Sequence, residues 1–137
     1  MYITPYLAFN GNAAQALAHY EQAFGVKATM VAHYNQAPSD QGYKPPPGTE
    51  NHIMHAALEF ETAQLYLADH PPGEEATFGD SISVMVELES AEKVNNVFKV
   101  LAQGGKVQME PQKVFWCECY STLTDKFGVY WMIATKD

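Results

Sequence analysis

Hydrophobic and polar positions follow two different periods along the first part of this chain. Ile3 to Phe9 contains β-branched and aromatic residues in partial alternation, which predicts a strand that Asn10-Gly11-Asn12 ends. From Ala13 to Phe24 the apolar residues recur every three or four positions, which predicts an amphipathic helix capped by Asn12 and ended by Gly25. Val26 to Tyr34 then predicts a second strand.

A hairpin follows from two further strand-like runs. His52 to Phe60 and Ala63 to His70 flank the short stretch Glu61-Thr62. A tight turn there would pair Ala57 with Tyr66 and His55 with Ala68. These four side chains are therefore expected on one face of the sheet.

The second half repeats this order of elements. A strand is predicted from Ser81 to Leu88. A second helix follows, with Ser90 as its cap, helical spacing of apolar positions from Val94 to Ala102, and an end at Gly104-Gly105. A short strand is then predicted from Lys106 to Met109. With the hairpin that closes the chain, each half contains strand, helix and three strands, and Asn12 corresponds to Ser90.

The repeat predicts an α+β fold in which two βαβββ modules form a curled mixed sheet around a cleft, with the helices outside. We expect a single domain over residues 1–137, with modules at about 1–72 and 78–137. The alternative is an ordinary α+β sandwich whose two halves are alike by chance.

The closing hairpin is predicted from Phe115 to Ala134, where Thr-Asp-Lys-Phe-Gly separates two aromatic, β-rich runs. If Asp125 to Gly128 form the loop, Thr124 lies opposite Val129. Alternation then places one set on a shared face: Phe115, Cys117, Cys119, Ser121, Tyr130, Met132 and Ala134. The other face carries Val114, Trp116, Glu118, Tyr120 and Trp131. The two tryptophans are expected to lie in the core, under a helix.

The segment from Asn35 to Asn51 is rich in proline and glycine, a composition that does not pair in the interior of a sheet. It is long for a connection without secondary structure. We interpret it as a mobile lid or as an arm that docks on a partner subunit, with a plain surface loop as the alternative.

Composition narrows the function classes. The formal net charge of −8 opposes binding to nucleic acid and to anionic membranes. The chain begins without a basic, apolar leader and has no apolar run long enough to span a bilayer, so we expect a cytoplasmic protein. Cys117 and Cys119 are poorly oriented for a disulfide if they lie on one strand, and free thiols fit a reducing compartment.

Four stretches of the chain carry a family resemblance: Ile3 to Ala13, Ala18 to Gly25, Met54 to Ala56 and Thr124 to Ile133. Together they resemble PhnB-like proteins of the vicinal oxygen chelate superfamily, which includes glyoxalases, extradiol dioxygenases and bleomycin-resistance proteins. The PhnB-like branch is also grouped with a demethylubiquinone 3-methyltransferase-like domain, although the sequence has no Gly-rich nucleotide-binding loop after a strand.

The resemblance implies a divalent metal held by His and Glu residues from four strands. The corresponding positions in this chain are Pro5, Tyr66, Ser83 and Met132. None of these is a good ligand for a hard or borderline cation. We therefore expect no metal at the superfamily's usual position, while a divalent metal at a relocated site is not excluded.

The cleft that the resemblance implies is expected to be largely apolar and to hold a small organic molecule. The expected ligand-binding residues are Leu7, Phe9, His55, Tyr66, Ser83, Met85, Cys119 and Met132. The candidate catalytic residues are His55, Cys117, Cys119 and Glu87. Each has a structural alternative: His55 as a hydrogen-bonded core histidine, the two cysteines as small buried thiols, and Glu87 as a solvated residue at the end of a strand.

Two functions follow from these observations. One is an enzyme that uses the cleft with altered or metal-free chemistry, and the other is a non-catalytic protein that sequesters a small molecule. We also expect a homodimer, from the proline-rich segment, the aromatic content and the resemblance.

Overall fold

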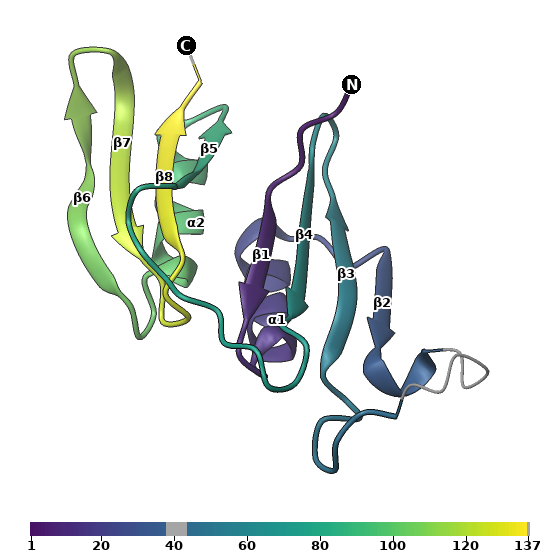
Figure 1. Ribbon diagram of the computed structural model, residues 1–137. Helices are drawn as coiled ribbons and strands as arrows, with labels where there is room; N and C mark the ends of the chain where they lie inside the picture. The colour runs from purple at the N-terminus through teal and green to yellow at the C-terminus, as the bar shows by residue number, and fades with distance from the viewer. Residues whose placement is uncertain (38–43, 137) are drawn as a thin grey trace. The chain divides into compact units, whose positions relative to one another are not determined.

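The computed structural model describes residues 1–37 and 44–136 of the chain (Figure 1). Contacts divide it into two compact units, unit 1 with residues 1–21 and 25–77 and unit 2 with residues 22–24 and 78–137. Unit 1 contains β1 (Tyr6–Phe9), most of α1 (Ala13–Phe24), β2 (Met30–His33), the 3-10 helix η1 (Tyr34–Gln36), β3 (Ile53–Glu59) and β4 (Gln64–Asp69). Unit 2 contains β5 (Val84–Leu88), α2 (Ala91–Leu101), β6 (Lys106–Val114), β7 (Cys117–Thr124) and β8 (Tyr130–Thr135).

Each unit has a four-stranded mixed sheet, with the order β1-β4-β3-β2 in unit 1 and β5-β8-β7-β6 in unit 2. In both sheets the first strand of the module pairs parallel with the last, and the other neighbours are antiparallel. The predicted α+β fold of two βαβββ modules is confirmed. The expectation that the chain acts as one domain stays a prediction.

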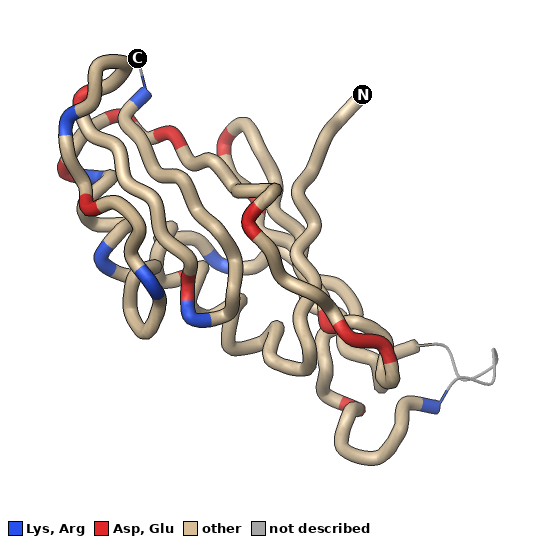
Figure 2. The backbone as a smooth tube through the Cα atoms, turned by 60° about the vertical axis from the view of Figure 1, so that its left-hand side comes forward, with Lys and Arg blue, Asp and Glu red and all other residues tan. Residues whose placement is uncertain are grey.

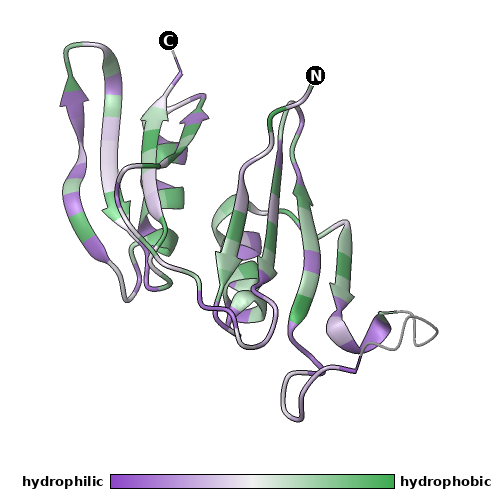
Figure 3. Cartoon of the chain, viewed as in Figure 1, coloured by the Kyte–Doolittle hydropathy of each residue, from purple (hydrophilic) through white to green (hydrophobic). Residues whose placement is uncertain are grey.

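The two helices follow their apolar periodicity. Helix α1 has the predicted bounds, and it ends at Gly25, whose φ of 67° is in the left-handed region that glycine tolerates. In α2 the predicted cap is confirmed, because Ser90 Oγ accepts a hydrogen bond from the Lys93 backbone N–H. Its buried side chains are Val94, Val97, Phe98 and Leu101, and Figure 3 shows the polar residues between them on the same helix.

The predicted side-chain cap of α1 is wrong. Asn12 makes no capping hydrogen bond. The carboxylate of Asp69, at the end of β4, accepts from the backbone N–H groups of Gly11 and Ala13 instead. A residue far away in the sequence therefore accepts hydrogen bonds from the backbone N–H groups at the beginning of the helix, which have no partner within the helix itself.

Several strands differ from their predicted lengths. Strand β1 begins at Tyr6, because Ile3 is 92% exposed and Pro5 has no N–H to donate to a sheet. Strand β2 begins at Met30 and β5 at Val84, whereas β6 extends to Val114 through Pro111. The proline is tolerated because β6 is an edge strand with register shifts along β7.

The β3–β4 hairpin has the predicted register. Ala57 lies opposite Tyr66, and the Phe60 N–H donates to the Ala63 carbonyl at 2.8 Å to close the turn. The short connection leaves little choice of pairing, and so the face shared by His55 and Tyr66 was predictable.

The β7–β8 hairpin differs from its prediction by one residue. Thr124 lies opposite Tyr130, not Val129. The loop runs from Asp125 to Val129, because the Asp125 N–H donates to the Val129 carbonyl and Asp125 Oδ1 accepts from the backbone N–H groups of Phe127 and Val129. Asp125 Oδ2 also accepts from Trp131 Nε1 at 2.8 Å, which ties the loop to the core.

The changed register exchanges the two faces of the hairpin on β8. Ser121 lies opposite Ile133, and Met132 lies opposite Thr122. The prediction that Met132 shares a face with Ser121 and Cys119 is therefore wrong. Trp131 is fully buried, as expected, whereas Trp116 is 47% exposed and not in the core.

The proline-rich segment is only partly described, since residues 38–43 lie outside the described part. At its two ends the Asn35 N–H donates to the Glu50 carbonyl, and Thr49 folds back on Pro46 through its N–H and hydroxyl. Its role as lid or arm stays a prediction.

Candidate functional site

An aromatic cluster lies on one face of the unit 1 sheet. The parallel register of β1 and β4 places Tyr6 beside Tyr66, and the hairpin places His55 on the same face. We call this the aromatic face. Its strand positions are Tyr6 and Ala8 on β1, Met30 and Ala32 on β2, His55, Ala57 and Glu59 on β3, and Gln64, Tyr66 and Ala68 on β4.

The three aromatic side chains contact each other directly. Tyr6 Oη and His55 Nδ1 are hydrogen-bonded at 2.7 Å. The Tyr66 ring stands nearly perpendicular to the other two, with centroids 4.9 Å from His55 and 5.8 Å from Tyr6. The Tyr66 hydroxyl donates to Gln64 Oε1 at 2.7 Å, so both phenol groups have a fixed partner.

The polar groups of this cluster remain accessible. Tyr6 is 52% exposed, and His55 and Tyr66 are half-buried. Burial, and then the neighbouring charge that an ionised Tyr66 would carry, raise the pKa of Tyr6 above its usual value. The Tyr6 phenol therefore keeps its proton at neutral pH and donates to His55 when Nδ1 is the unprotonated ring nitrogen.

Leu7 and Phe9, which were predicted to bind the ligand, lie on the opposite face. They pair with Leu67 and Asp69, and Phe9 is fully buried. The correction follows from alternation, since neighbours along β1 point to opposite sides of the sheet. Tyr6 takes their place on the aromatic face, and sequence reasoning missed it because nothing local fixed how β1 pairs with β4.

Asp69 has a structural role on this buried face. Its side chain is 2% exposed, and its second oxygen, Oδ2, accepts from the Ile53 N–H at 2.9 Å. Together with the two hydrogen bonds to the beginning of α1, the carboxylate connects β1, α1, β3 and β4. It holds the strands that bear the aromatic cluster in register.

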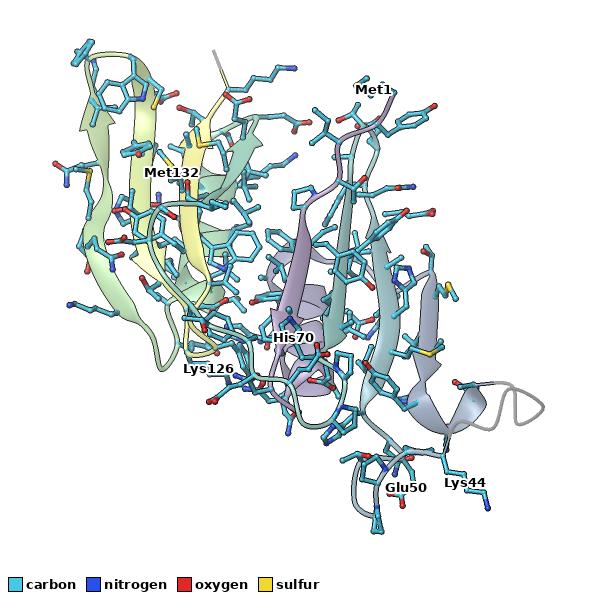
Figure 4. The ribbon with its side chains drawn as sticks, viewed as in Figure 1. Met1, Lys44, Glu50, His70, Lys126 and Met132 are labelled. Atoms are coloured by element: carbon cyan, nitrogen blue, oxygen red, sulfur yellow. The ribbon has the colours of Figure 1, made fainter. Side chains whose placement is uncertain are left out.

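A second set of predicted residues lies together in unit 2. Met85 pairs with Met132 and Glu87 with Ala134, and Ser83 Oγ donates to Met132 Sδ at 3.0 Å. These side chains define the methionine face of the unit 2 sheet, and Figure 4 labels Met132 on β8. Met85 is 45% exposed and Glu87 is exposed, so the expected grouping of Ser83, Met85 and Met132 is present within this sheet.

The cysteines are not part of the methionine face. Cys119 is 5% exposed, and its sulfur lies 4.0 Å from Nδ2 of Asn95 on α2, so it faces the helix. Burial, followed by the nearby Cys117 and Glu118, raises the pKa of the Cys119 thiol and disfavours the reactive thiolate. The Cys117 sulfhydryl contacts the Cys119 carbonyl at 3.4 Å. The prediction that Cys119 lines the ligand site with Met132 is wrong, because these side chains point to opposite sides.

Within residues 1–37 and 44–136, no group of three or more His, Cys, Asp or Glu side chains is arranged to hold a metal ion. In the same part of the chain, no helix is both long enough and apolar enough to cross a membrane.

Comparison with known proteins identifies relatives along almost the whole chain. The family described as 3-demethylubiquinone-9 3-methyltransferase matches residues 1–134. The structure of protein PA1353 from Pseudomonas aeruginosa is 30% identical with a TM-score of 0.87, covering 99% of this chain and 98% of that one.

Two further structures extend the similarity. A PhnB protein from Bacillus cereus is 25% identical with a TM-score of 0.80, covering 99% of this chain and all of that one. A glyoxalase/bleomycin resistance protein/dioxygenase family enzyme from Burkholderia phytofirmans shares the fold, with a TM-score of 0.63 at 13% identity over 96% of this chain and 95% of that one.

Proposed function

This chain belongs to the family described as 3-demethylubiquinone-9 3-methyltransferase, and we propose that it binds a small organic molecule on the aromatic face of unit 1. The resemblance to PhnB-like proteins with a glyoxalase-like fold is confirmed by the family match and the structural relatives. The observation that supports ligand binding is the accessible cluster of Tyr6, His55 and Tyr66, with its 2.7 Å hydrogen bond.

The chemistry of the aromatic face suits an organic ligand. Tyrosine and histidine rings offer apolar area together with a hydrogen-bonding tip. Three alanines, Ala8, Ala57 and Ala68, occupy neighbouring positions of the same face, but Ala57 and Ala68 are buried and leave little area for a ligand. A planar or branched apolar group would therefore lie against the exposed aromatic rings, while the Tyr6–His55 pair would orient a polar atom.

The residues at the superfamily's metal positions do not fit a divalent ion. In unit 1 the phenol of Tyr66 donates to Gln64, and Pro5 has no donor atom in its side chain. In unit 2 the Ser83 hydroxyl donates to the thioether of Met132. Neutral phenol, hydroxyl and thioether groups do not compensate the lost hydration of a hard cation. The function proposed here therefore uses no step through a metal.

A second candidate function is catalysis by proton transfer. In the tautomer in which His55 Nδ1–H donates to the Tyr6 oxygen, Nε2 is unprotonated and would accept a proton from a bound substrate, while the phenol holds the ring in this tautomer. Of the other candidate catalytic residues, the buried Cys119 is disfavoured, and Cys117 and Glu87 stay predictions. The methyl transfer in the family's description would need a methyl donor, and neither face has an observation that favours one.

The test is a fragment screen by nuclear magnetic resonance on the full chain. We expect bound fragments to shift the amide signals of Tyr6, His55 and Tyr66, and Tyr66→Ala to weaken binding by removing one ring. The matched control is Phe115→Ala, which removes a ring that is 97% exposed on the β6–β7 hairpin. Bound fragments that leave those three amides unchanged, or that respond equally to both variants, would reject this site.

Turnover separates the two candidates. A substrate-dependent reaction that His55→Ala abolishes would favour the enzyme, whereas stoichiometric binding without turnover would favour a sequestering protein. We also propose that the protein acts as a cytoplasmic homodimer. The exposed apolar side chain of Val31 on the edge strand β2 supports the dimer.

A further inference from the structure

Most of the net negative charge of the chain lies in its first part, because few lysines offset the carboxylates there. Residues 1–77 contain two lysines and eight carboxylate side chains, and the whole chain has no arginine. Most of the positive positions lie in unit 2, as the blue segments of Figure 2 show. The field around unit 1 therefore favours cationic ligands and opposes anionic ones.

The aromatic face itself follows the same charge pattern. Among its described strand positions there is no lysine, and the only acidic residue is Glu59. Glu59 is exposed and lies opposite Gln64, whose Oε1 accepts the Tyr66 hydroxyl proton. Diagonal neighbours on a sheet are about 7–8 Å apart, so this carboxylate is near enough to Tyr66 to act on the same ligand.

The rings present the electron-rich surfaces that attract cations. The planes of Tyr6 and Tyr66 meet at 79° and those of His55 and Tyr66 at 73°, so the ring faces point in different directions around one small region. Tyrosine faces attract ammonium groups through the ring quadrupole. The three rings contact one another, with centroids 5.5, 5.8 and 4.9 Å apart, so a cation would lie on their outer faces and not between them. Met30, 50% exposed and paired with Ala57, adds apolar area beside them.

We propose that the aromatic face binds an organic cation, a tertiary or quaternary amine with apolar substituents, over the rings of Tyr6 and Tyr66 and beside the carboxylate of Glu59. The inference rests on the proposed ligand site and names the chemical class of its ligand. Ring stacking alone would not distinguish charged from neutral ligands. The combination of three rings, one carboxylate and no lysine does so.

The test compares choline with 3,3-dimethyl-1-butanol, which has the same shape but a carbon in place of the charged nitrogen. Titrations of the full chain are followed by nuclear magnetic resonance. We expect choline to bind about tenfold more tightly, from two ring contacts of ordinary cation–π strength and one nearby carboxylate. Added salt should reduce this ratio.

Variants assign the preference to this face. Tyr66→Leu should remove most of the ratio between the affinities for choline and for the neutral alcohol. Glu59→Gln changes an exposed side chain and preserves the fold, and it should reduce this affinity ratio about threefold, in line with an exposed ionic contact. Glu118→Gln removes an exposed carboxylate from unit 2 and should leave the ratio unchanged. Equal affinity for both probes would overturn the cation preference and leave the ligand site standing. Absence of binding by both would also overturn it, and the fragment screen decides separately on the site.

Discussion

Replacing Asp69 by alanine should strongly destabilise unit 1, because three backbone N–H groups, two of them buried, lose the carboxylate that accepts from them. Gly11, Ala13 and Ile53 donate to the carboxylate at 2.8, 2.9 and 2.9 Å. An orphaned buried donor costs about 1–3 kcal/mol, and removing a desolvated carboxylate returns part of that cost. We expect a loss of about 3–5 kcal/mol, a large part of the roughly 5–15 kcal/mol typical of folded domains.

Asp69→Asn tests the charge separately from the shape. The amide oxygen still accepts from two N–H groups, while the amide NH₂ faces the third donor. A loss of about 2 kcal/mol is expected, smaller than for alanine. Glu61→Ala is the control, since it removes the same charge from an exposed turn.

Urea denaturation followed by far-UV circular dichroism gives the free energies of unfolding, and amide hydrogen exchange localises the effect. Exchange should accelerate first at Gly11, Ala13 and Ile53 in the alanine variant, and at only one of these N–H groups in the asparagine variant. If Asp69→Ala stays within about 1 kcal/mol of Glu61→Ala, the carboxylate does not connect these elements and the argument fails.

Three further predictions concern side-chain environments and assembly. Iodoacetamide should modify Cys117 well before Cys119, because Cys119 is 5% exposed and burial raises its pKa; peptide mass mapping that finds equal rates would contradict its place under α2. The pKa values of Tyr6 and Tyr120 are raised, mainly by burial, so the unfolded chain releases these protons first and the free energy of unfolding should fall as pH rises through about 10. A urea midpoint that is constant up to pH 11 would refute this. Sedimentation velocity at tens of micromolar should give a dimer, and a monomer would reject that proposal.

The sequence predicted those parts of the fold in which the information is local. The bounds of α1 follow from its 3.6-residue period and from Gly25, whose left-handed backbone ends the helix. The β3–β4 register follows from a connection too short to allow another pairing. The repeat of strand, helix and three strands then gave the fold, because each module alone leaves few alternatives.

Other features depended on partners far apart in the chain. Tyr6 pairs with Tyr66 across sixty positions, and both Tyr6 and Leu7 are compatible with a half-apolar strand. The β7–β8 loop has one residue more than predicted because the Asp125 carboxylate accepts from Phe127, Val129 and Trp131. These hydrogen bonds have no periodic signal, and a shift of one residue moves every later side chain to the other face.

The pairing of β1 with β4, which no local signal fixed, changes the chemistry expected of the site in unit 1. With Leu7 and Phe9 on the ligand side the face would be apolar, whereas Tyr6 brings a phenol that is hydrogen-bonded to His55. Tyr6→Phe separates the consequences, because it keeps the ring and removes only the hydroxyl. If the face recognises an organic cation through its rings, choline affinity should change less than twofold. If the Tyr6–His55 pair transfers protons, turnover of a substrate should fall about 100-fold, the lower end of general acid–base contributions, with little change in binding. A variant that loses choline affinity as completely as Tyr66→Leu would show that the hydroxyl, rather than the ring face, makes the contact.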